Sequence, residues 1–87
     1  SQYYEDLEVS PNEIKNIQDA KSLLSSTFQN LFQSSPVLPD LNINELIEES
    51  FIRSAYEFCE YNQVNTAKLL GVTRNVIRTR LIKYGLL

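Results

Sequence analysis

The first half of the chain carries apolar residues at helical spacing between a clear start signal and a proline-rich stop. Ser10, Pro11 and Glu13 are the residue types expected at the cap and at the first and third positions of a helix. The apolar stripe that follows consists of Ile14, Ile17, Leu24, Phe28 and Leu31. Two prolines interrupt the pattern in residues 34–39. We therefore expect a first helix that is capped by Ser10 and runs to about Gln33.

A second helical pattern begins at Asn42, with Glu45 three residues later as its capping partner and Leu41 and Leu46 placed as a hydrophobic staple. It continues to about Tyr61, and its apolar residues divide into two faces. One face comprises Leu46, Ile47, Phe51, Ser54 and Phe58, and the other comprises Ile52, Ala55, Tyr56 and Cys59. A helix with so wide an apolar arc is buried on two sides. We expect one side to contact the C-terminal part of the chain and the other to contact a partner.

Residues 62–87 predict two short helices separated by a glycine turn. Asn62 and Thr73 are good caps for the two helices, and Gly71 and Gly85 follow their last periodic residues, where a left-handed conformation ends a helix. The apolar faces are formed by Val64, Ala67 and Leu70 in the first helix and by Ile77, Leu81 and Tyr84 in the second. We expect the angle between the helices to be set by an apolar triangle of Leu70, Val72 and Ile77.

Charge is distributed very unevenly along the chain. Residues 62–87 contain no acid and five bases, namely Lys68, Arg74, Arg78, Arg80 and Lys83. The remaining residues hold the other three bases and all eleven acids, so the net charge of −3 conceals an acidic body and a basic end. Such asymmetry indicates a nucleic-acid or membrane partner.

The second short helix presents polar and basic residues on the side opposite its apolar stripe. That side carries Asn75, Arg78, Thr79 and Ile82, flanked by Arg74 and Lys83. An α-helix fits the major groove of DNA, where arginine can donate two hydrogen bonds to guanine. The two helices, the turn and this cationic face predict a helix-turn-helix. A solvated basic helix on a small helical domain is the alternative.

The C-terminal stretch resembles the helix-turn-helix of the Fis family, found in the nucleoid protein Fis and at the C-terminus of NtrC-type sigma-54-dependent activators. The matching residues are Asn62-Gln63, Ala67, Leu69-Leu70-Gly71, Arg74, Leu81 and Lys83-Tyr84-Gly85. Upstream, Phe51-Ile52-Arg53 and Ala55 resemble the helix that precedes this module in the activators. The resemblance covers roughly residues 42–87, about half of the chain.

The resemblance implies an all-α, Fis-like fold in which two longer helices form a dimeric four-helix bundle, followed by the C-terminal helix-turn-helix. We accordingly expect an acidic mobile segment in residues 1–9, a dimerisation region in residues 10–61 and the helix-turn-helix in residues 62–87. The homodimer also follows from the surplus apolar face of the second helix, which a symmetry mate would cover. A monomer whose first helix covers that face is the alternative.

The same resemblance implies contacts with double-stranded DNA at Thr73, Arg74, Val76, Arg78, Thr79 and Arg80. Family members often have a polar residue in place of Val76 and a lysine in place of Thr79, so fewer charges are available in this chain. From their positions we expect Arg74 and Arg78 to reach base edges or to lie near the groove wall, with polar contacts from Asn75 and Thr79. Phosphate contacts are expected from Lys68, Arg80 and Lys83.

Enzymatic and metal-binding functions find little support in the composition. The chain has no histidine and one cysteine, Cys59, which excludes a zinc site on ligand count. Its carboxylates, including Glu48, Glu49, Glu57 and Glu60, alternate with apolar residues as solvated helix faces do. No GxxxxGK[ST] motif is present, so we expect no ATP hydrolysis by this chain and no cofactor. We therefore expect a binding protein that is not an enzyme.

The leading hypothesis is sequence-specific DNA binding as the C-terminal domain of a bacterial sigma-54-dependent transcriptional activator, with a dimer reading a pseudo-palindromic site through the helix from about Arg74 to Tyr84. RNA polymerase and an upstream ATPase domain would then be partners through the parent protein. A free-standing Fis-like protein that bends DNA, or a protein-interaction module, is the alternative.

The chain shows no segment for membrane insertion or export. No apolar run approaches the length of about 18 residues that spans a membrane, and no basic-then-apolar start resembles a signal peptide. We expect a cytoplasmic, nucleoid-associated protein without a membrane partner. Because the chain begins with Ser1 rather than methionine, we expect it to be a fragment of a longer protein.

Overall fold

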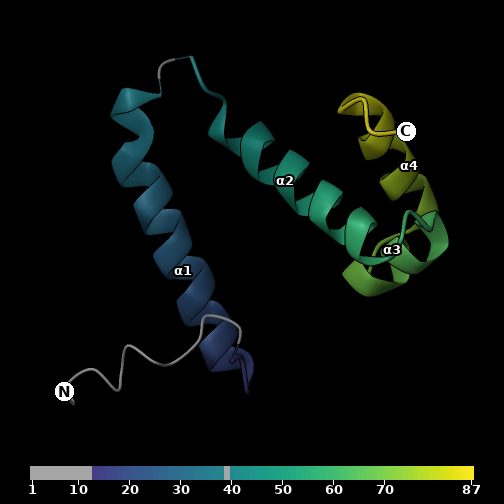
Figure 1. The fold of residues 1–87 in the computed structure, drawn as a ribbon, viewed down its shortest axis with the longest axis horizontal. Helices are drawn as coiled ribbons and strands as arrows, with labels where there is room; N and C mark the ends of the chain where they lie inside the picture. Colours follow the sequence, from purple (N-terminus) through teal and green to yellow (C-terminus); the bar gives the residue numbers. More distant parts are fainter. Residues whose placement is uncertain (1–12, 39) are drawn as a thin grey trace. The chain divides into compact units, whose positions relative to one another are not determined.

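The computed structural model describes residues 13–38 and 40–87, and all regular structure within them is helical. The elements are α1 (Ile17–Ser34), the short 3-10 helix η2 (Ser35–Val37), α2 (Ile43–Phe58), α3 (Gln63–Leu70) and α4 (Arg74–Lys83) (Figure 1). The chain divides into two compact units, Ser1–Asp40 and Leu41–Leu87, which are described separately. The prediction of an all-helical protein is confirmed for the described residues.

The first unit contains α1, which begins later than the sequence predicts. Its cap is Asn16, whose side chain accepts a hydrogen bond from the amide of Asp19 at 2.9 Å, while the amide of Lys15 donates to the Asp19 carboxylate at 3.0 Å. These two bonds form a local capping arrangement, similar to a capping box, that sets the start of the helix. Residues 13–15 are not helical, so the prediction of a helix through Glu13 is wrong. The predicted cap at Ser10 and Pro11 lies outside the described residues.

The apolar stripe of α1 remains accessible along the helix. None of its residues is buried, and Ile17, Leu24 and Phe32 are each more than half exposed. Phe28 and Phe32, four residues apart, stack with their ring centroids 6.4 Å from each other. The side chains therefore follow the expected helical face, and this face exposes apolar surface.

Helix α2 opens the second unit and is shorter than predicted. Asn42 caps it as expected, accepting from the amide of Glu45 at 3.0 Å. The helix ends at Phe58 and not near Tyr61, because Glu60 and Tyr61 adopt left-handed conformations with φ of 54° and 63°. Their amides donate to carbonyls of the last turn, and the chain then leaves in the extended conformation that the next cap requires.

The two short helices of residues 62–87 have the predicted ends. Asn62 caps α3 through a 2.8 Å bond to the amide of Asn65, and Thr73 caps α4 through a 3.3 Å bond to the amide of Val76. Gly71, with φ of +74°, ends α3 in the left-handed conformation, and its amide donates to the Ala67 carbonyl at 2.9 Å. Glycine adopts this conformation at low cost, which is why the turn can be so short.

A small core joins α2, α3 and α4. It consists of Ile52, Ala67, Ile77 and Leu81, with Tyr56, Leu70 and Leu86 packed against it. Ile77 and Leu81 are completely buried, as their stripe predicted. Ala67 is also buried, and its small side chain permits the close crossing of α3 and α4.

One of the three residues predicted to form the apolar triangle, Val72, is not part of the core. Val72 is 39% exposed, while Thr66 is completely buried and its hydroxyl donates to the carbonyl of Asn62 at 2.7 Å. That internal hydrogen bond satisfies the hydroxyl, so a polar residue can occupy the interior of this turn.

The two faces of α2 differ in burial as the sequence indicates. Ile52 and Ala55 are buried on the side that faces α3 and α4, whereas Phe51 and Phe58 on the other side are 56% and 78% exposed. One predicted contact, that with the C-terminal helices, is therefore confirmed. None of the described helices is both long enough and apolar enough to span a membrane.

Candidate nucleic-acid interface

Helix α4 presents a continuous polar face on the side away from the core. Arg74, Asn75, Arg78 and Thr79 are all exposed, and Ile82 is 52% exposed at the end of the same face. Val76 lies at the border and is half-buried. The face exists because Ile77 and Leu81 turn the opposite side of the helix into the core. Four of the exposed residues expected for DNA contact therefore lie together on one helix.

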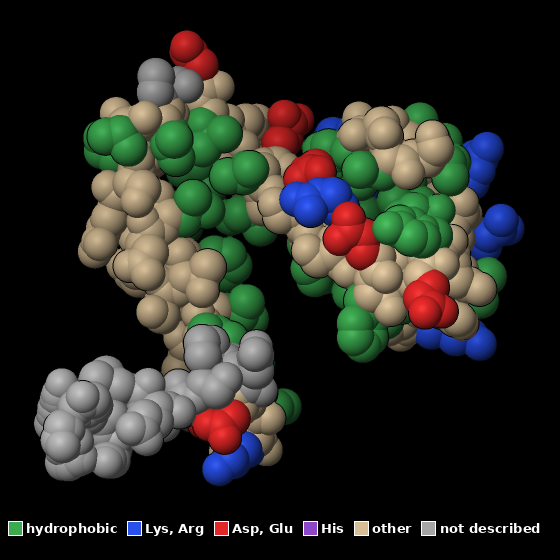
Figure 2. All heavy atoms as spheres, viewed as in Figure 1, with side chains coloured by type: hydrophobic (Ala, Val, Ile, Leu, Met, Phe, Trp, Pro, Cys, Tyr) green, Lys and Arg blue, Asp and Glu red, His purple; other side chains and the backbone are tan. Residues whose placement is uncertain are grey.

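The five bases of the second unit's basic end fall into two groups. Lys68 on α3 and Arg74 and Arg78 on α4 are exposed and form no ion pair with any residue that the structure describes. In Figure 2, Lys and Arg side chains project from the edge of this unit that α3 and α4 form. These three cations carry charge that is not compensated within the described chain, and they are available to an anionic partner.

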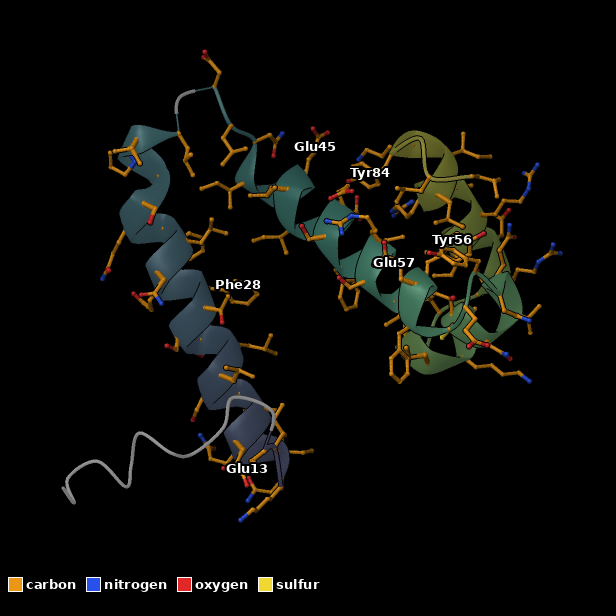
Figure 3. All side chains as sticks on the ribbon, in the orientation of Figure 1. Glu13, Phe28, Glu45, Tyr56, Glu57 and Tyr84 are labelled. Atoms are coloured by element: carbon orange, nitrogen blue, oxygen red, sulfur yellow. The ribbon has the colours of Figure 1, made fainter. Side chains whose placement is uncertain are left out.

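The other two bases, Arg80 and Lys83, are held by carboxylates of α2. Arg80 Nε lies 3.0 Å from Glu48 Oε2, and Lys83 Nζ lies 3.5 Å from Glu48 Oε1 and 3.7 Å from Glu45 Oε2. The Tyr84 hydroxyl also donates to Glu48, and the Lys83 ammonium sits 5.1 Å from the centre of the Tyr84 ring. Figure 3 shows Glu45 on α2 and Tyr84 at the end of α4 on the same side of the unit. Both predicted phosphate contacts on α4 thus have partners within the chain.

This arrangement shifts the proton affinities of its members. The hydrogen bond from Tyr84, followed by that from Arg80, lowers the pKa of Glu48, because both donors favour the charged carboxylate. The same hydrogen bond to Glu48 raises the pKa of the Tyr84 phenol. Glu48 is therefore anionic, and Tyr84 a neutral donor, throughout the neutral pH range.

Sequence reasoning missed the role of Glu48. It was expected to be one of several solvated carboxylates, yet it accepts from three side chains that are 32 to 36 residues away. The available signal was its position: Glu48 precedes the core residue Ile52 by one helical turn and so lies on the same face of α2. An acid on an otherwise apolar, core-facing stripe requires a partner.

The N-terminal turns of α3 and α4 also supply donors. The first amides of any helix have no intrahelical acceptor and attract anions. Thr73 and Asn62 are placed at these two turns, as the sequence predicts. Among the described residues no group of three or more His, Cys, Asp or Glu side chains could hold a metal ion.

Two known proteins resemble this chain. Over 65 residues, it is 51% identical to the sigma54-dependent transcriptional regulator SfnR of Pseudomonas fluorescens (strain Pf0-1). Over the same length, it is 45% identical to the sigma54-dependent transcriptional activator SfnR of Pseudomonas putida. Each match covers 75% of this chain and 17% of the relative, so the chain spans about a sixth of the length of these proteins. No family model and no solved structure matches it.

Proposed function

We propose that residues 41–87 are the sequence-specific DNA-binding unit of a sigma-54-dependent transcriptional regulator and that α3, the turn and α4 form a Fis-type helix-turn-helix. The observation that carries the proposal is the exposed face of α4, where Arg74 and Arg78 have no competing carboxylate among the described residues. The two relatives are both named as sigma54-dependent regulators, which supplies the biological setting. ATP hydrolysis, if the parent protein performs it, belongs to another domain.

The chemistry of the α4 face fits the major groove. Arg74 and Arg78 lie one helical turn apart and form one row, while Asn75 and Thr79 form a second row beside it. Arginine donates two parallel bonds to guanine O6 and N7, and asparagine can bond adenine in a similar way. Lys68 on α3 would contact phosphate beside the groove and thereby hold the register of the recognition helix.

The proposed working form is a homodimer on a pseudo-palindromic site. The outer face of α2 exposes Phe51 and Phe58, and α1 exposes its own apolar stripe. Large apolar side chains exposed along one helix face suit a contact surface, and a second copy of the chain would cover it. A twofold axis would then place two α4 helices on successive major grooves, which is how helix-turn-helix dimers read half-sites.

The proposal is tested by measuring duplex binding and molecular mass together. Fluorescence anisotropy with labelled random and selected duplexes at several salt concentrations gives the affinity, and sedimentation gives the stoichiometry. If each half-site neutralises roughly three to four phosphates, log K against log salt should fall with a slope of about −5 to −7 for the dimer. A slope near zero would contradict groove binding. Capture of an acidic protein without any shift of duplex DNA would indicate an interaction module instead.

A further inference from the structure

The contacts between α2 and α4 follow an ordered register. Ile52 of α2 packs in the same cluster as Ile77 and Leu81 of α4. One turn earlier on α2, Glu48 meets Arg80 and Tyr84, and Glu45 then meets Lys83 near the end of α4. The two helices therefore run in opposite directions where they touch, and the carboxylates extend the apolar contact into a polar one at its open edge.

We propose that Glu48 is a positioning residue that holds Arg80 and Lys83 against α2, so that Lys68, Arg74 and Arg78 are the cations of this unit that meet DNA phosphate and bases. This inference rests on the DNA-binding function proposed above and deepens it. It changes the expected roles of Arg80 and Lys83, which the sequence placed at phosphates. It also assigns Glu48 a role in specificity, because fewer non-specific phosphate contacts leave more of the affinity to base readout.

A single exposed ion pair would be too weak to hold a cation against a phosphate. Glu48 differs from such a pair in two ways. Three donors on one face of α4 converge on its carboxylate, and the helix that carries them is fixed to α2 by buried Ile77 and Leu81. The Glu48 and Arg80 side chains are 32% and 40% exposed, so solvent weakens each contact and the convergence of the three donors is what distinguishes Glu48. The donors are preorganised on the carboxylate, and Arg80 would lose this contact on turning to DNA.

The role of Glu48 can be measured through the salt dependence of the DNA affinity. Each α4 cation that is released to phosphate adds one contact in each subunit and two in the dimer, which steepens the slope of log K against log salt by about 2. Glu48→Gln removes the charge while it keeps an acceptor for Tyr84. Arg80 then loses its carboxylate, and Lys83 keeps only the exposed 3.7 Å pair with Glu45, which is too weak to hold it against a phosphate, so both cations are released. With both cations available to phosphate, the slope should steepen by about 4 for the dimer, and the ratio of specific to non-specific affinity should fall.

The matched control is Glu49→Gln, which removes the same charge from the neighbouring residue. Glu49 pairs within α2 with Arg53, at 3.0 Å, and not with α4. It should leave the slope within about half a unit of the wild-type value, because no cation of α4 is released. An equal change of slope in the two variants would overturn the inference, since net charge alone would then explain it.

Arg80→Gln completes the experiment. In the wild-type background it should leave the slope nearly unchanged, because Glu48 already occupies Arg80, whereas in the Glu48→Gln background it should remove about half of the added steepness. Circular dichroism and thermal unfolding establish that each variant folds. If Glu48→Gln does not fold, Arg80→Gln alone decides: an unchanged slope supports the inference, and a loss of about 2 for the dimer overturns it.

The failure of the inference is distinguishable from the failure of the proposed function. If the wild-type chain binds no duplex at any salt concentration, both fail. If the wild type binds with a steep slope and the Glu48→Gln variant behaves like the Glu49→Gln control, only the role of Glu48 fails. If Glu48 had only a structural role, the Glu48→Gln variant would have a lower melting temperature and an unchanged salt dependence. That result would also overturn the inference.

Discussion

The Tyr84 hydroxyl at the C-terminal end of α4 donates a hydrogen bond to the Glu48 carboxylate on α2, although 36 residues separate them in the chain. The bond joins the last turn of the proposed recognition helix to the longest helix of its unit. It extends the contact made by Ile52, Ile77 and Leu81 toward the edge of the core. The orientation of α4 is thus set by buried apolar residues in the middle and by a charged acceptor at the end.

Replacing Tyr84 by phenylalanine should raise the pKa of Glu48 toward its ordinary value, because the Tyr84 hydrogen bond is the largest cause of its lowering. The shift should be incomplete, since Arg80 still donates to the carboxylate. Titration of the Glu48 carboxyl carbon by NMR measures it. Tyr61→Phe is the matched control, because Tyr61 is 65% exposed and is not among the groups that shift the pKa of Glu48. An unchanged Glu48 pKa in Tyr84→Phe would show that the hydroxyl does not contact Glu48 in solution.

The contribution of Glu48 to stability should depend on pH with a definite sign. Its pKa in the folded protein lies below the ordinary value near 4.5, so its contribution is fully present above about pH 4.5 and is lost as the pH falls through the lower folded value. Between pH 5 and pH 3 the free energy of unfolding should therefore fall more steeply in the wild type than in Glu48→Gln. Urea denaturation across this range provides the measurement. Parallel pH profiles of the two proteins would refute the linkage.

Arg78→Ala should weaken binding to a selected operator by about 1–3 kcal/mol if Arg78 reads a guanine. The loss should be largest on the preferred sequence and smaller on random duplexes, as competition binding would reveal. Lys21→Ala removes an exposed charge from α1 and serves as the control. Equal losses on every sequence would instead identify Arg78 as a phosphate contact.

Backbone conformation at the ends of α2 and α4 should give stability effects of opposite sign. Glu60 holds a φ of 54° without being glycine, so Glu60→Gly should raise the free energy of unfolding by about 0.5–1 kcal/mol through relief of left-handed strain. Gly85 holds a φ of 69°, and an added Cβ would meet no atom within 4 Å. Gly85→Ala should therefore lower the free energy of unfolding by about 1 kcal/mol through backbone strain alone. Urea denaturation of both variants measures the effects. Stabilisation by Gly85→Ala would contradict the assigned conformation.

Asn62→Ala should destabilise the second unit by about 1 kcal/mol, because it removes the side-chain acceptor 2.8 Å from the amide of Asn65. Asn44→Ala is the matched control. Asn44 is exposed in the first turn of α2 and is not its cap, so alanine there should be neutral or slightly stabilising. Thermal unfolding compares the two, and equal losses would mean that the Asn62 cap contributes nothing specific.

Local signals in the sequence predicted most of the helical architecture. The caps at Asn42, Asn62 and Thr73 and the stop at Gly71 each depend on hydrogen bonds or backbone angles within a few residues, so their positions are visible in the chain itself. The start of α1 was missed because Asn16 and Asp19 form a competing local cap that lacks the serine and proline of the expected one.

The sequence by itself determined where α2, α3 and α4 begin, which residues of α4 face the core, and that positive charge collects at the C-terminal end. Tertiary structure decided which of those charges remain available. In the sequence, all four bases of α4 are alike, and nothing local separates Arg80 and Lys83 from Arg74 and Arg78. The crossing of α2 and α4 brings Glu45 and Glu48 to Arg80 and Lys83 and leaves Arg74 and Arg78 exposed. The physical reason is the sequence separation of the interacting groups. A helix cap joins residues within one turn, whereas an ion pair between residues 32 positions apart forms only once the core has set the positions of both helices.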